Sequence, residues 1–473
     1  MRKTAVNIAR LILAVVLILS GFVKAVDPLG TQYKIDDYLL AMNMGGVVPS
    51  IVTLVASVAL SAMEFSLGIF LLFAIRRRLV SRVVVVMMGI MTLLTLWLAL
   101  ANPISDCGCF GDAIVLTNWQ TLLKNVVLLT AAIIVARWPL EMFRFVSRSN
   151  QWIVINYTIL FIIGISAWSL YYLPQFDFRP YHIGASIREG MEMPEGAEQP
   201  QFETTFILEK NGERREFTLD NYPDSTWTFI DSRTVQTSEG FVPPIHDFSI
   251  VLCGETPEHQ ETPELSETLE RLETPEYQES QEYQEDITEE VLSDTSYTFL
   301  LVAPYLDKAD DSRLDLINEL YEYSLEHGYR FYCLTASAKS QQDMWREMTG
   351  ADYPFCQTDD VTLKTIIRSN PGMVLLKDGR VIRKWSHNDL PQLDSEQFTL
   401  PLHRLEIGQM PEDSVPGKIV KLLLWFVLPL ALLTIADRLW MWTRWVRRNE
   451  KPATSEEQER NEKPATSEEQ EKE

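Results

Sequence analysis

Six apolar segments organise the chain, five of them before residue 175 and one near the C-terminus. Their length and near lack of charge are typical of helices that cross about 30 Å of hydrocarbon. The predicted spans are residues 11–23, 47–75, 83–101, 119–136, 152–173 and 419–436. The first span follows Arg2, Lys3 and Arg10, as a signal peptide would. Because no small-residue cleavage site comes after it, we expect a retained helix.

The basic residues between the spans predict an orientation. Arginine-rich segments are 76–82, 137–148 and 438–448. The loops 27–46 and 102–118 instead carry more Asp than Lys or Arg. Because basic segments stay on the cytoplasmic side, both termini are expected in the cytoplasm. The 102–118 loop and residues 174–416 would then face the periplasm from the inner (cytoplasmic) membrane, where disulfides persist.

Residues 174–416 read as a soluble insertion with two parts. Short alternating runs within 202–231 predict a small β unit. Farther along, strands alternate with helices, and Asp378-Gly379 between two apolar runs predicts a hairpin. The expected elements are strand 297–303, helix 312–327, strand 329–334, helix 339–349, extended segment 354–357, helix 360–368 and hairpin 372–385. This pattern predicts a mixed sheet with helices on both faces.

Acidic residues dominate two low-complexity segments and bring the formal net charge to -23. Glu recurs at every third position over 255–285, and residues 449–459 are repeated as 461–471. Both segments have little apolar content, so we expect disorder in an insertion at 255–290 and in the tail. The insertion reads either as an acidic binding strip or as a tolerated repeat expansion. An acidic chain repels phosphate, which argues against a nucleic-acid partner.

Cys107 and Cys109 are the leading candidates for chemistry. They flank Gly108 in a polar turn between two spans, and the chain has only five cysteines, with no CxxC and no zinc-ligand spacing. A disulfide within Cys-x-Cys closes a very small ring and is easily reduced, which suits thiol–disulfide exchange better than a structural role. The alternative is a pair of inert buried cysteines. Two thiolates without a nearby histidine make an incomplete metal site, so no metal is expected.

Four further features are candidates for lesser roles. Glu64 lies inside the second span, where an ionisable group is functional or paired. Lys24 is a plausible partner for Glu64 or for Asp27, and Glu64 reads equally as a proton relay or as half of a packing ion pair. Cys333 and Cys356 read as neighbours or as isolated cysteines. The histidines at 246, 327, 387 and 403 show no catalytic spacing and are expected at the surface.

The first four spans resemble the DoxX/MauE group of redox-associated membrane proteins, which includes the methylamine utilisation protein MauE. The matching residues are Ser20-Gly21-Phe22-Val23-Lys24 with Asp27-Pro28, the span that contains Glu64, and Asn102 with Cys107-Gly-Cys109-Phe-Gly-Asp112. The resemblance covers residues 1–138, and the CGCFGD stretch is its most diagnostic part. It implies a four-helix membrane bundle associated with redox chemistry.

The soluble region resembles a thioredoxin-like domain from Pro243 onward, in an arrangement similar to a Bacteroidota-type architecture. Asn370-Pro371-Gly372 stands where that family keeps its cis-proline, which implies a peptide-binding edge. The family's CxxC would follow the strand 297–303, but the chain reads Pro304-Tyr305-Leu306-Asp307-Lys308 there. The resemblance therefore implies a domain that docks a client and does not catalyse.

These inferences predict a multi-domain membrane protein in which an all-α bundle carries an extracytoplasmic α/β thioredoxin-like domain. The expected parts are a four-helix domain at 1–140, a fifth span at 150–174, a small β-rich segment at 175–240, the thioredoxin-like domain at 241–410, a sixth span at 417–440 and a disordered cytoplasmic tail at 445–473.

The predicted function is thiol–disulfide exchange by Cys107 and Cys109 at the periplasmic face, with Glu64 and Lys24 in support. A periplasmic client protein and the lipid bilayer are the expected partners. No bound cofactor is expected, and a membrane quinone is a candidate electron partner. The rival hypothesis is a non-catalytic anchor or assembly factor, a MauE-like maturation accessory whose soluble domain binds a partner. A transporter is disfavoured because the spans show no inverted repeat.

Overall fold

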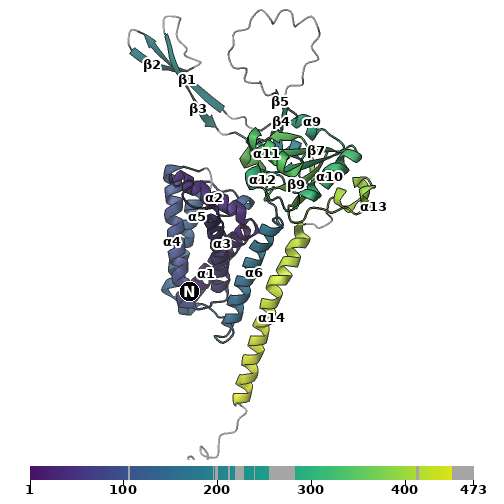
Figure 1. Ribbon diagram of the computed structural model, residues 1–473. Coiled ribbons are helices and arrows are strands. Elements are labelled where there is room, and N and C mark those ends of the chain that lie inside the picture. Colours follow the sequence, from purple (N-terminus) through teal and green to yellow (C-terminus); the bar gives the residue numbers. More distant parts are fainter. Residues whose placement is uncertain are drawn as a thin grey trace, which may run out of the picture. The chain divides into compact units, whose positions relative to one another are not determined.

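The computed structural model divides the chain into two compact units, Met1–Ala167 with Asp413–Glu473 and Trp168–Glu412 (Figure 1). It describes residues 1–104, 107–194, 196–197, 201–210, 213–218, 228–238, 240–254, 283–411 and 415–449. The tail was predicted to be disordered over 445–473, but residues 445–449 belong to helix α14 (Val415–Asn449), so its start was placed too early. The rest of the tail and most of the predicted acidic insertion lie outside the described residues. Each unit is treated by itself below.

Within the described residues, the first unit contains six helices that are long and apolar enough to cross a membrane, which makes this a multi-pass membrane protein. They are α1 (Arg2–Val26), α3 (Ser50–Leu72), α4 (Arg77–Ala101), α5 (Asn118–Arg137), α6 (Gln151–Tyr171) and α14 (Val415–Asn449). The six predicted spans are thus confirmed. Helices α1 and α14 extend beyond their apolar runs, because arginines that do not favour hydrocarbon are still compatible with helix.

Helices α1 and α3 approach so closely that only glycine fits between them. A Cβ atom on Gly21 would lie 2.3 Å from the backbone nitrogen of Phe65 and 2.8 Å from the carbonyl oxygen of Ser61. A Cβ atom on Gly68 would lie 2.9 Å from the backbone nitrogen of Ile18. Small residues at such contacts let helix backbones pack directly on one another in a membrane. The side chains that α1 and α3 carry near Gly21 are therefore held close to one another.

A helix that the sequence analysis took for a loop lies between α1 and α3. It is α2 (Pro28–Ala41) in the 27–46 loop. The Asp27 side chain caps it by accepting a hydrogen bond from Gly30 N at 2.9 Å, and Pro28 occupies the first turn. The Ser57 hydroxyl donates to Pro28 O at 2.7 Å, which ties α2 to α3. The Asp-Pro start signal was present in the sequence, but α2 has no continuous apolar stripe to reveal it.

Helix α14 is attached to the rest of the first unit at two points. Phe426 packs against Phe161 of α6, with ring centroids 4.3 Å apart. Near the other end, the Asp437 carboxylate accepts hydrogen bonds from the backbone nitrogen of Ser147 at 2.7 Å and from the Asn150 side chain at 2.7 Å. A carboxylate this well satisfied is tolerated inside an apolar span. The sixth span is therefore tethered to α6 and to the α5–α6 connection, while most of its surface stays unburied.

The second unit is built on a seven-stranded mixed sheet with the order β10-β9-β6-β7-β8-β4-β5. The strands are β4 (Val251–Gly254), β5 (Tyr283–Asp286), β6 (Tyr297–Val302), β7 (Arg330–Thr335), β8 (Phe355–Gln357), β9 (Gly372–Lys377) and β10 (Arg380–Ser386). Strands β6, β7 and β8 run parallel, and the other neighbours are antiparallel. A separate three-stranded sheet contains β1 (Gln201–Lys210), β2 (Glu213–Thr218) and β3 (Thr228–Ser238) in the order β2-β1-β3.

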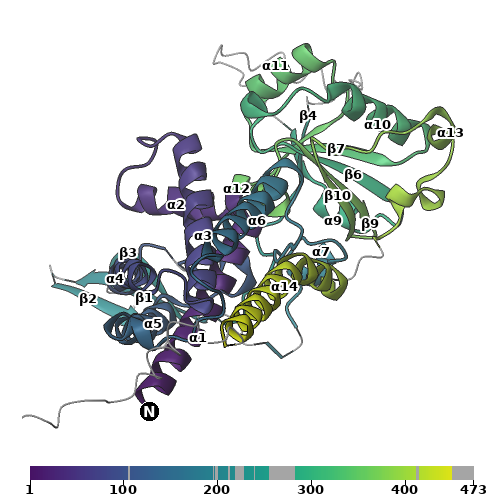
Figure 2. The same cartoon turned by 90° about the horizontal axis from the view of Figure 1, so that it is seen from below.

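Helices cover both faces of the seven-stranded sheet (Figure 2). The helices are α7 (Ile187–Met191), α9 (Thr288–Leu292), α10 (Leu314–Glu326), α11 (Lys339–Thr349), α12 (Asp360–Ile366) and α13 (Ser395–Phe398). Ile317 of α10 and Trp345 of α11 join the apolar core on one face, whereas Val291 of α9 and Leu363 of α12 join the core on the other. The predicted mixed sheet with helices on both faces is confirmed.

The edge of the sheet departs from the prediction. Strands β4 and β5 pair with each other, and β4 continues the sheet beside β8. Because β5 and α9 occupy 283–292, the insertion that was predicted to be disordered as far as residue 290 ends by residue 282. The sequence signal was missed because β5 is short and continues the acidic repeat, so only its pairing with β4 identifies it as a strand.

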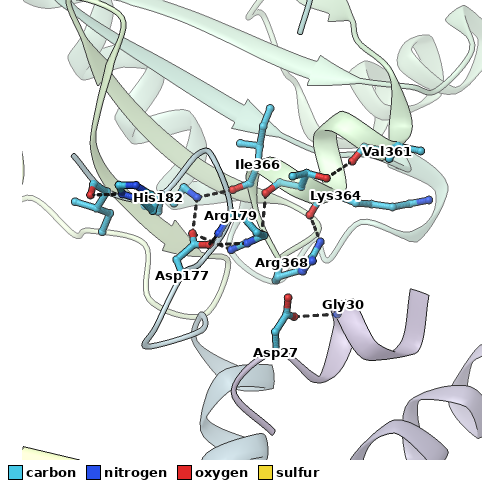
Figure 3. A network of polar contacts seen from close by, with 12 residues as sticks. Asp27, Gly30, Asp177, Arg179, His182, Val361, Lys364, Ile366 and Arg368 are labelled. Atoms are coloured by element: carbon cyan, nitrogen blue, oxygen red, sulfur yellow. Dashed lines mark hydrogen bonds and ion pairs between the residues drawn. The ribbon is translucent and has the colours of Figure 1, made fainter. Parts of the chain in front are cut away.

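A buried ionic network ties the start of the second unit to its hairpin (Figure 3). Asp177 accepts hydrogen bonds from Arg179 Nε at 2.7 Å and from Lys384 Nζ at 2.9 Å, and the Lys384 and Arg179 side chains are each only 3% exposed. Burial alone would raise the pKa of the Asp177 carboxyl, but the two cations outweigh it and hold that pKa well below its usual range. Burial lowers the pKa of Lys384 to about 8.

Replacing Asp177 with Asn should destabilise the second unit by about 3–5 kcal/mol, because Arg179 and Lys384 would remain buried without a counter-charge. Hydrogen exchange of the β10 amides in the full-length protein measures this loss. Glu189→Gln is the control: its carboxylate is 73% exposed and 3.3 Å from Arg380, so its loss should cost less than about 1 kcal/mol. Equal hydrogen-exchange protection of the β10 amides in Asp177→Asn and Glu189→Gln would contradict the stabilising role assigned to the Asp177 network.

Replacing Gly21 with Ala should destabilise the first unit by about 2–3 kcal/mol, because the new methyl group meets the backbone of α3 and not a movable side chain. Thermal unfolding of the protein in detergent measures the effect. Gly89→Ala on α4 is the matched control, since a Cβ atom added there would have no atom within 4 Å to meet. That variant should be neutral or slightly stabilising, because alanine favours helix over glycine.

Candidate functional site

Cys107 and Cys109 lie in the short connection between α4 and α5. A disulfide joins them, and their Cα atoms are 5.5 Å apart. Gly108 and Gly111 adopt φ values of +60° and +52°, which residues with a side chain rarely adopt. Cys107 is 9% exposed and Cys109 is half-buried, so Cys109 is the more accessible of the two. We refer to residues 107–111 as the CGC turn.

Helix α2 lies against the CGC turn. The Tyr38 hydroxyl donates a hydrogen bond to the carbonyl oxygen of Cys107 at 2.5 Å. The aliphatic part of Lys34 passes Gly108 so closely that a Cβ atom there would lie 3.0 Å from Lys34 Cγ. From the other side, Lys124 Nζ lies 4.4 Å from the centre of the Phe110 ring, which is a favourable cation–π distance. The turn is therefore held by α2 and α5 as well as by its own disulfide.

A buried ion pair lies beneath the CGC turn. Lys24 Nζ is 2.7 Å from Glu64 Oε2, and the two side chains are 7% and 5% exposed. Of the two partners considered for Lys24, the structure therefore selects Glu64, while Asp27 caps α2. The close approach at Gly21 makes this pairing possible, because it brings α3 within reach of the lysine on the next turn of α1.

Ser20 connects the ion pair to the CGC turn. Its hydroxyl oxygen lies 2.9 Å from Lys24 Nζ, 2.7 Å from Glu64 Oε2 and 2.8 Å from the carbonyl oxygen of Cys109. The ammonium group donates to the hydroxyl, and the hydroxyl has one proton to donate to either Glu64 or Cys109. The sequence analysis quoted Ser20 in a motif but gave it no role. Its four-residue spacing from Lys24, which places both on one face of α1, was the available signal.

The remaining cysteines do not form a second redox pair within the described part of the chain. Cys333 belongs to the apolar core on one face of the sheet and Cys356 to the core on the opposite face. Adjacent parallel strands with Cys333 opposite Phe355 direct these two side chains apart. Burial raises the pKa of the Cys333 thiol well above its ordinary value, which makes it unreactive. The side chain of Cys253 lies outside the described residues.

Residues 304–308, which follow strand β6, contain Tyr305 and no cysteine. The Asn370–Pro371 peptide bond is cis, and the Asn370 side chain donates a hydrogen bond to Tyr305 O at 2.8 Å. Nearby, Ser369 Oγ lies 2.9 Å from His387 Nδ1. His387 is half-buried and hydrogen-bonded to Ser369, which corrects its prediction as an ordinary surface residue. His327 is likewise half-buried, with Nε2 2.9 Å from Phe398 O.

Among the described residues, no group of three or more His, Cys, Asp or Glu side chains is arranged to hold a metal ion. The geometry of the first unit instead offers a two-sulfur centre above a buried acid–base pair. A sulfur pair can accept or release two electrons, and Glu64 and Lys24 are groups that can exchange protons.

Comparison with known proteins bears on both parts of the chain. Residues 2–137 match the family described as methylamine utilisation protein MauE, and residues 202–239 match a domain of unknown function (DUF8463). No curated protein and no solved structure matches the chain. The MauE match spans the four helices α1, α3, α4 and α5, the CGC turn and the Ser20–Lys24–Glu64 network. The N-terminal membrane region of this protein is therefore MauE-like.

Proposed function

We propose that the protein is an inner-membrane thiol–disulfide exchange protein whose reactive centre is Cys107 and Cys109 at the periplasmic face. The observation that carries the proposal is the placement of a bonded, partly accessible Cys-x-Cys pair directly on a buried Ser20–Lys24–Glu64 network. The basic segments 76–82 and 137–148 support the orientation, since they lie on the side of the spans opposite the CGC turn.

The exchange begins with a client thiolate that attacks a sulfur of the Cys107–Cys109 disulfide. Cys109 is the favoured target because it is the more exposed. The attack forms a mixed disulfide and releases Cys107 as a thiolate. A second client thiolate then attacks the client sulfur of the mixed disulfide, which leaves an oxidised client and a reduced pair. A membrane quinone that accepts two electrons and two protons from the reduced pair restores the disulfide. In the reverse direction, the reduced pair gives two electrons to a client disulfide and reduces it.

Glu64 and Lys24 have two candidate roles at this centre. In the first, they take up or release the protons that accompany the two-electron change of the sulfurs. A change in their protonation then alters the hydrogen bond between Ser20 and the carbonyl oxygen of Cys109. In the second, they are a packing ion pair that fixes α1 against α3. Both roles use the same contacts, and a double-mutant cycle separates them.

We propose a thioredoxin-like fold and a client-docking role for the second unit. The order β10-β9-β6-β7, with α10 between the parallel strands β6 and β7 and an antiparallel hairpin after α12, is the arrangement that the resemblance implies. The cis bond at Asn370–Pro371 lies immediately before that hairpin. Since residues 304–308 contain no cysteine, this unit would recognise the client and leave the chemistry to Cys107 and Cys109.

A second candidate function is a non-catalytic anchor or assembly factor. It is favoured by the burial of Cys107 and by the Tyr38 hydrogen bond to its carbonyl, which would equally serve a structural disulfide. In that case the protein would hold its partner at the membrane through the second unit, and the CGC turn would never be reduced during its working cycle.

Single-cysteine variants distinguish the two functions. In Cys107→Ser, Cys109 should trap a client as a mixed disulfide that a reductant releases, and in the double variant Cys107→Ser/Cys109→Ser the complex should disappear. The measurement is non-reducing electrophoresis with mass spectrometry, together with a membrane-impermeant thiol reagent before and after reduction. Cys333→Ser should behave as the wild type, because Cys333 is 0% exposed. Failure of both CGC cysteines to label in reduced, intact cells would remove the exchange function.

A double-mutant cycle decides the role of the ion pair. Glu64→Leu and Lys24→Met should each destabilise the protein by about 3–5 kcal/mol, and the double variant should recover most of that loss, because no buried charge then lacks its partner. If Glu64 exchanges protons, the restored double variant should still exchange disulfides at least about tenfold more slowly, and the rate should lose its pH dependence. A double variant with the wild-type rate and pH profile would make the pair purely structural.

A further inference from the structure

The connection between α5 and α6 has its backbone carbonyls bound by arginines from three other helices. Arg77 of α4 donates from Nη1 to Leu140 O at 2.7 Å and to Met142 O at 2.8 Å. Arg10 of α1 donates from Nη1 to Phe143 O at 2.6 Å. Arg438 of α14 donates to the carbonyl oxygen of Arg144. We refer to Arg10, Arg77, Arg144 and Arg438 as the arginine cluster.

Arg10, Arg77 and Arg438 are held by neutral carbonyl groups, so these contacts do not cancel their positive charge. Two acidic side chains lie on the same segments in the described part of the unit. Glu141 pairs with Arg2. Asp437 is hydrogen-bonded to Ser147 and Asn150 and also attracts Arg438, so it offsets one of the positive charges of the cluster. Arg144 and Arg148 are close enough to repel the charge of Arg77. The cluster therefore carries a net positive charge that an anion would neutralise.

Hydrogen-bonding capacity also remains in the arginine cluster. The Nε–H groups of Arg10, Arg77 and Arg144 find no acceptor among the described residues. Arg10 is only 7% exposed, and burying a guanidinium without satisfying its donors is costly. The Arg144 side chain makes no hydrogen bond to any described residue through its Nε, although its own carbonyl is bound by Arg438. The described residues therefore leave these guanidinium groups incompletely satisfied.

Apolar and aromatic side chains surround the arginine cluster. Leu140 and Phe143 are each 58% exposed, and Trp138 is 36% exposed. The Arg438 guanidinium lies 5.3 Å from the centre of the Phe143 ring, and Arg10 lies 5.8 Å from that of Phe145. Exposed aromatic rings beside arginines at the ends of spans are typical of the level of the lipid headgroups. The surface thus combines cations for a headgroup with apolar side chains for acyl chains.

We propose that the arginine cluster binds the phosphate headgroup of an anionic phospholipid. Guanidinium groups recognise phosphate oxygens in a bidentate manner and do so more strongly than neutral donors. Basic pockets between transmembrane helices are suited to such headgroups. The bound lipid would neutralise the cluster and hold the α5–α6 connection against α1, α4 and α14. This site is independent of the chemistry proposed for the CGC turn.

The test uses the full-length protein in detergent and native mass spectrometry. Phosphatidylglycerol and phosphatidylcholine are added at equal concentration, and phosphatidylglycerol should be retained at least about tenfold better. Arg144→Gln should reduce that retention about fivefold, as expected for the loss of one cation near a headgroup. This variant leaves the carbonyl contacts of Arg77 and Arg10 intact, so it should fold. Arg77→Gln should reduce retention further.

Two controls make the result decisive. Arg444→Gln removes a cation from α14 outside the cluster, where the guanidinium lies 5.0 Å from the Trp440 ring, and it should leave retention unchanged. Inorganic phosphate at millimolar concentration should not displace the lipid, because it lacks the acyl chains. The proposal is overturned if Arg144→Gln and Arg444→Gln behave alike, if phosphatidylcholine is retained equally, or if free phosphate alone occupies the site.

Discussion

The close approach of α1 and α3 at Gly21 is the contact on which the rest of the first unit depends. Because a backbone and not a side chain lies opposite Gly21, the two helices can come near enough for Lys24 to reach Glu64. In hydrocarbon neither charge would be tolerated alone, so the pair and the glycine contact support each other. Ser20 lies on the same face of α1 and carries the network to the carbonyl oxygen of Cys109. The position of the CGC turn therefore follows from helix packing several residues away.

This arrangement would suit the proposed exchange function, because it places the sulfurs apart from the groups that can exchange protons. The sulfur pair lies in a short connection where two glycines permit the backbone conformation, and Tyr38 of α2 donates a hydrogen bond to the backbone at Cys107. The groups able to exchange protons lie below it, inside the bundle. Since Ser20 has one proton and two acceptors within 2.8 Å, a change in the charge of Glu64 would alter the hydrogen bond that the CGC turn receives. In the arginine cluster, by contrast, Arg10, Arg77 and Arg438 are held by neutral carbonyl groups.

In the second unit, buried charges form a network that joins segments far apart in the chain. Asp177 and Arg179 come at its start, whereas Lys384 comes more than two hundred residues later in the hairpin. Their contact joins the hairpin to the first residues of the unit. Such a buried network costs desolvation and is tolerated because each charge has partners. Within this unit, the network anchors the segment around Asp177 to strand β10 of the sheet.

The sequence by itself determined the six spans, the mixed sheet with helices on both faces, the hairpin at Asp378-Gly379 and the pair Cys107 and Cys109. These features depend on hydrophobic periodicity, on turn chemistry and on local spacing, all of which are short-range properties. Tertiary structure alone decided that Lys24 pairs with Glu64 and not Asp27, that Ser20 joins them to Cys109, that Cys333 and Cys356 lie on opposite faces, and that β4 and β5 extend the sheet. Each of these depends on which distant backbone lies alongside, and one residue of register in a strand reverses the face of a side chain. Helix α2 falls between the two cases, because its Asp-Pro cap was visible but its docking against α3 was not.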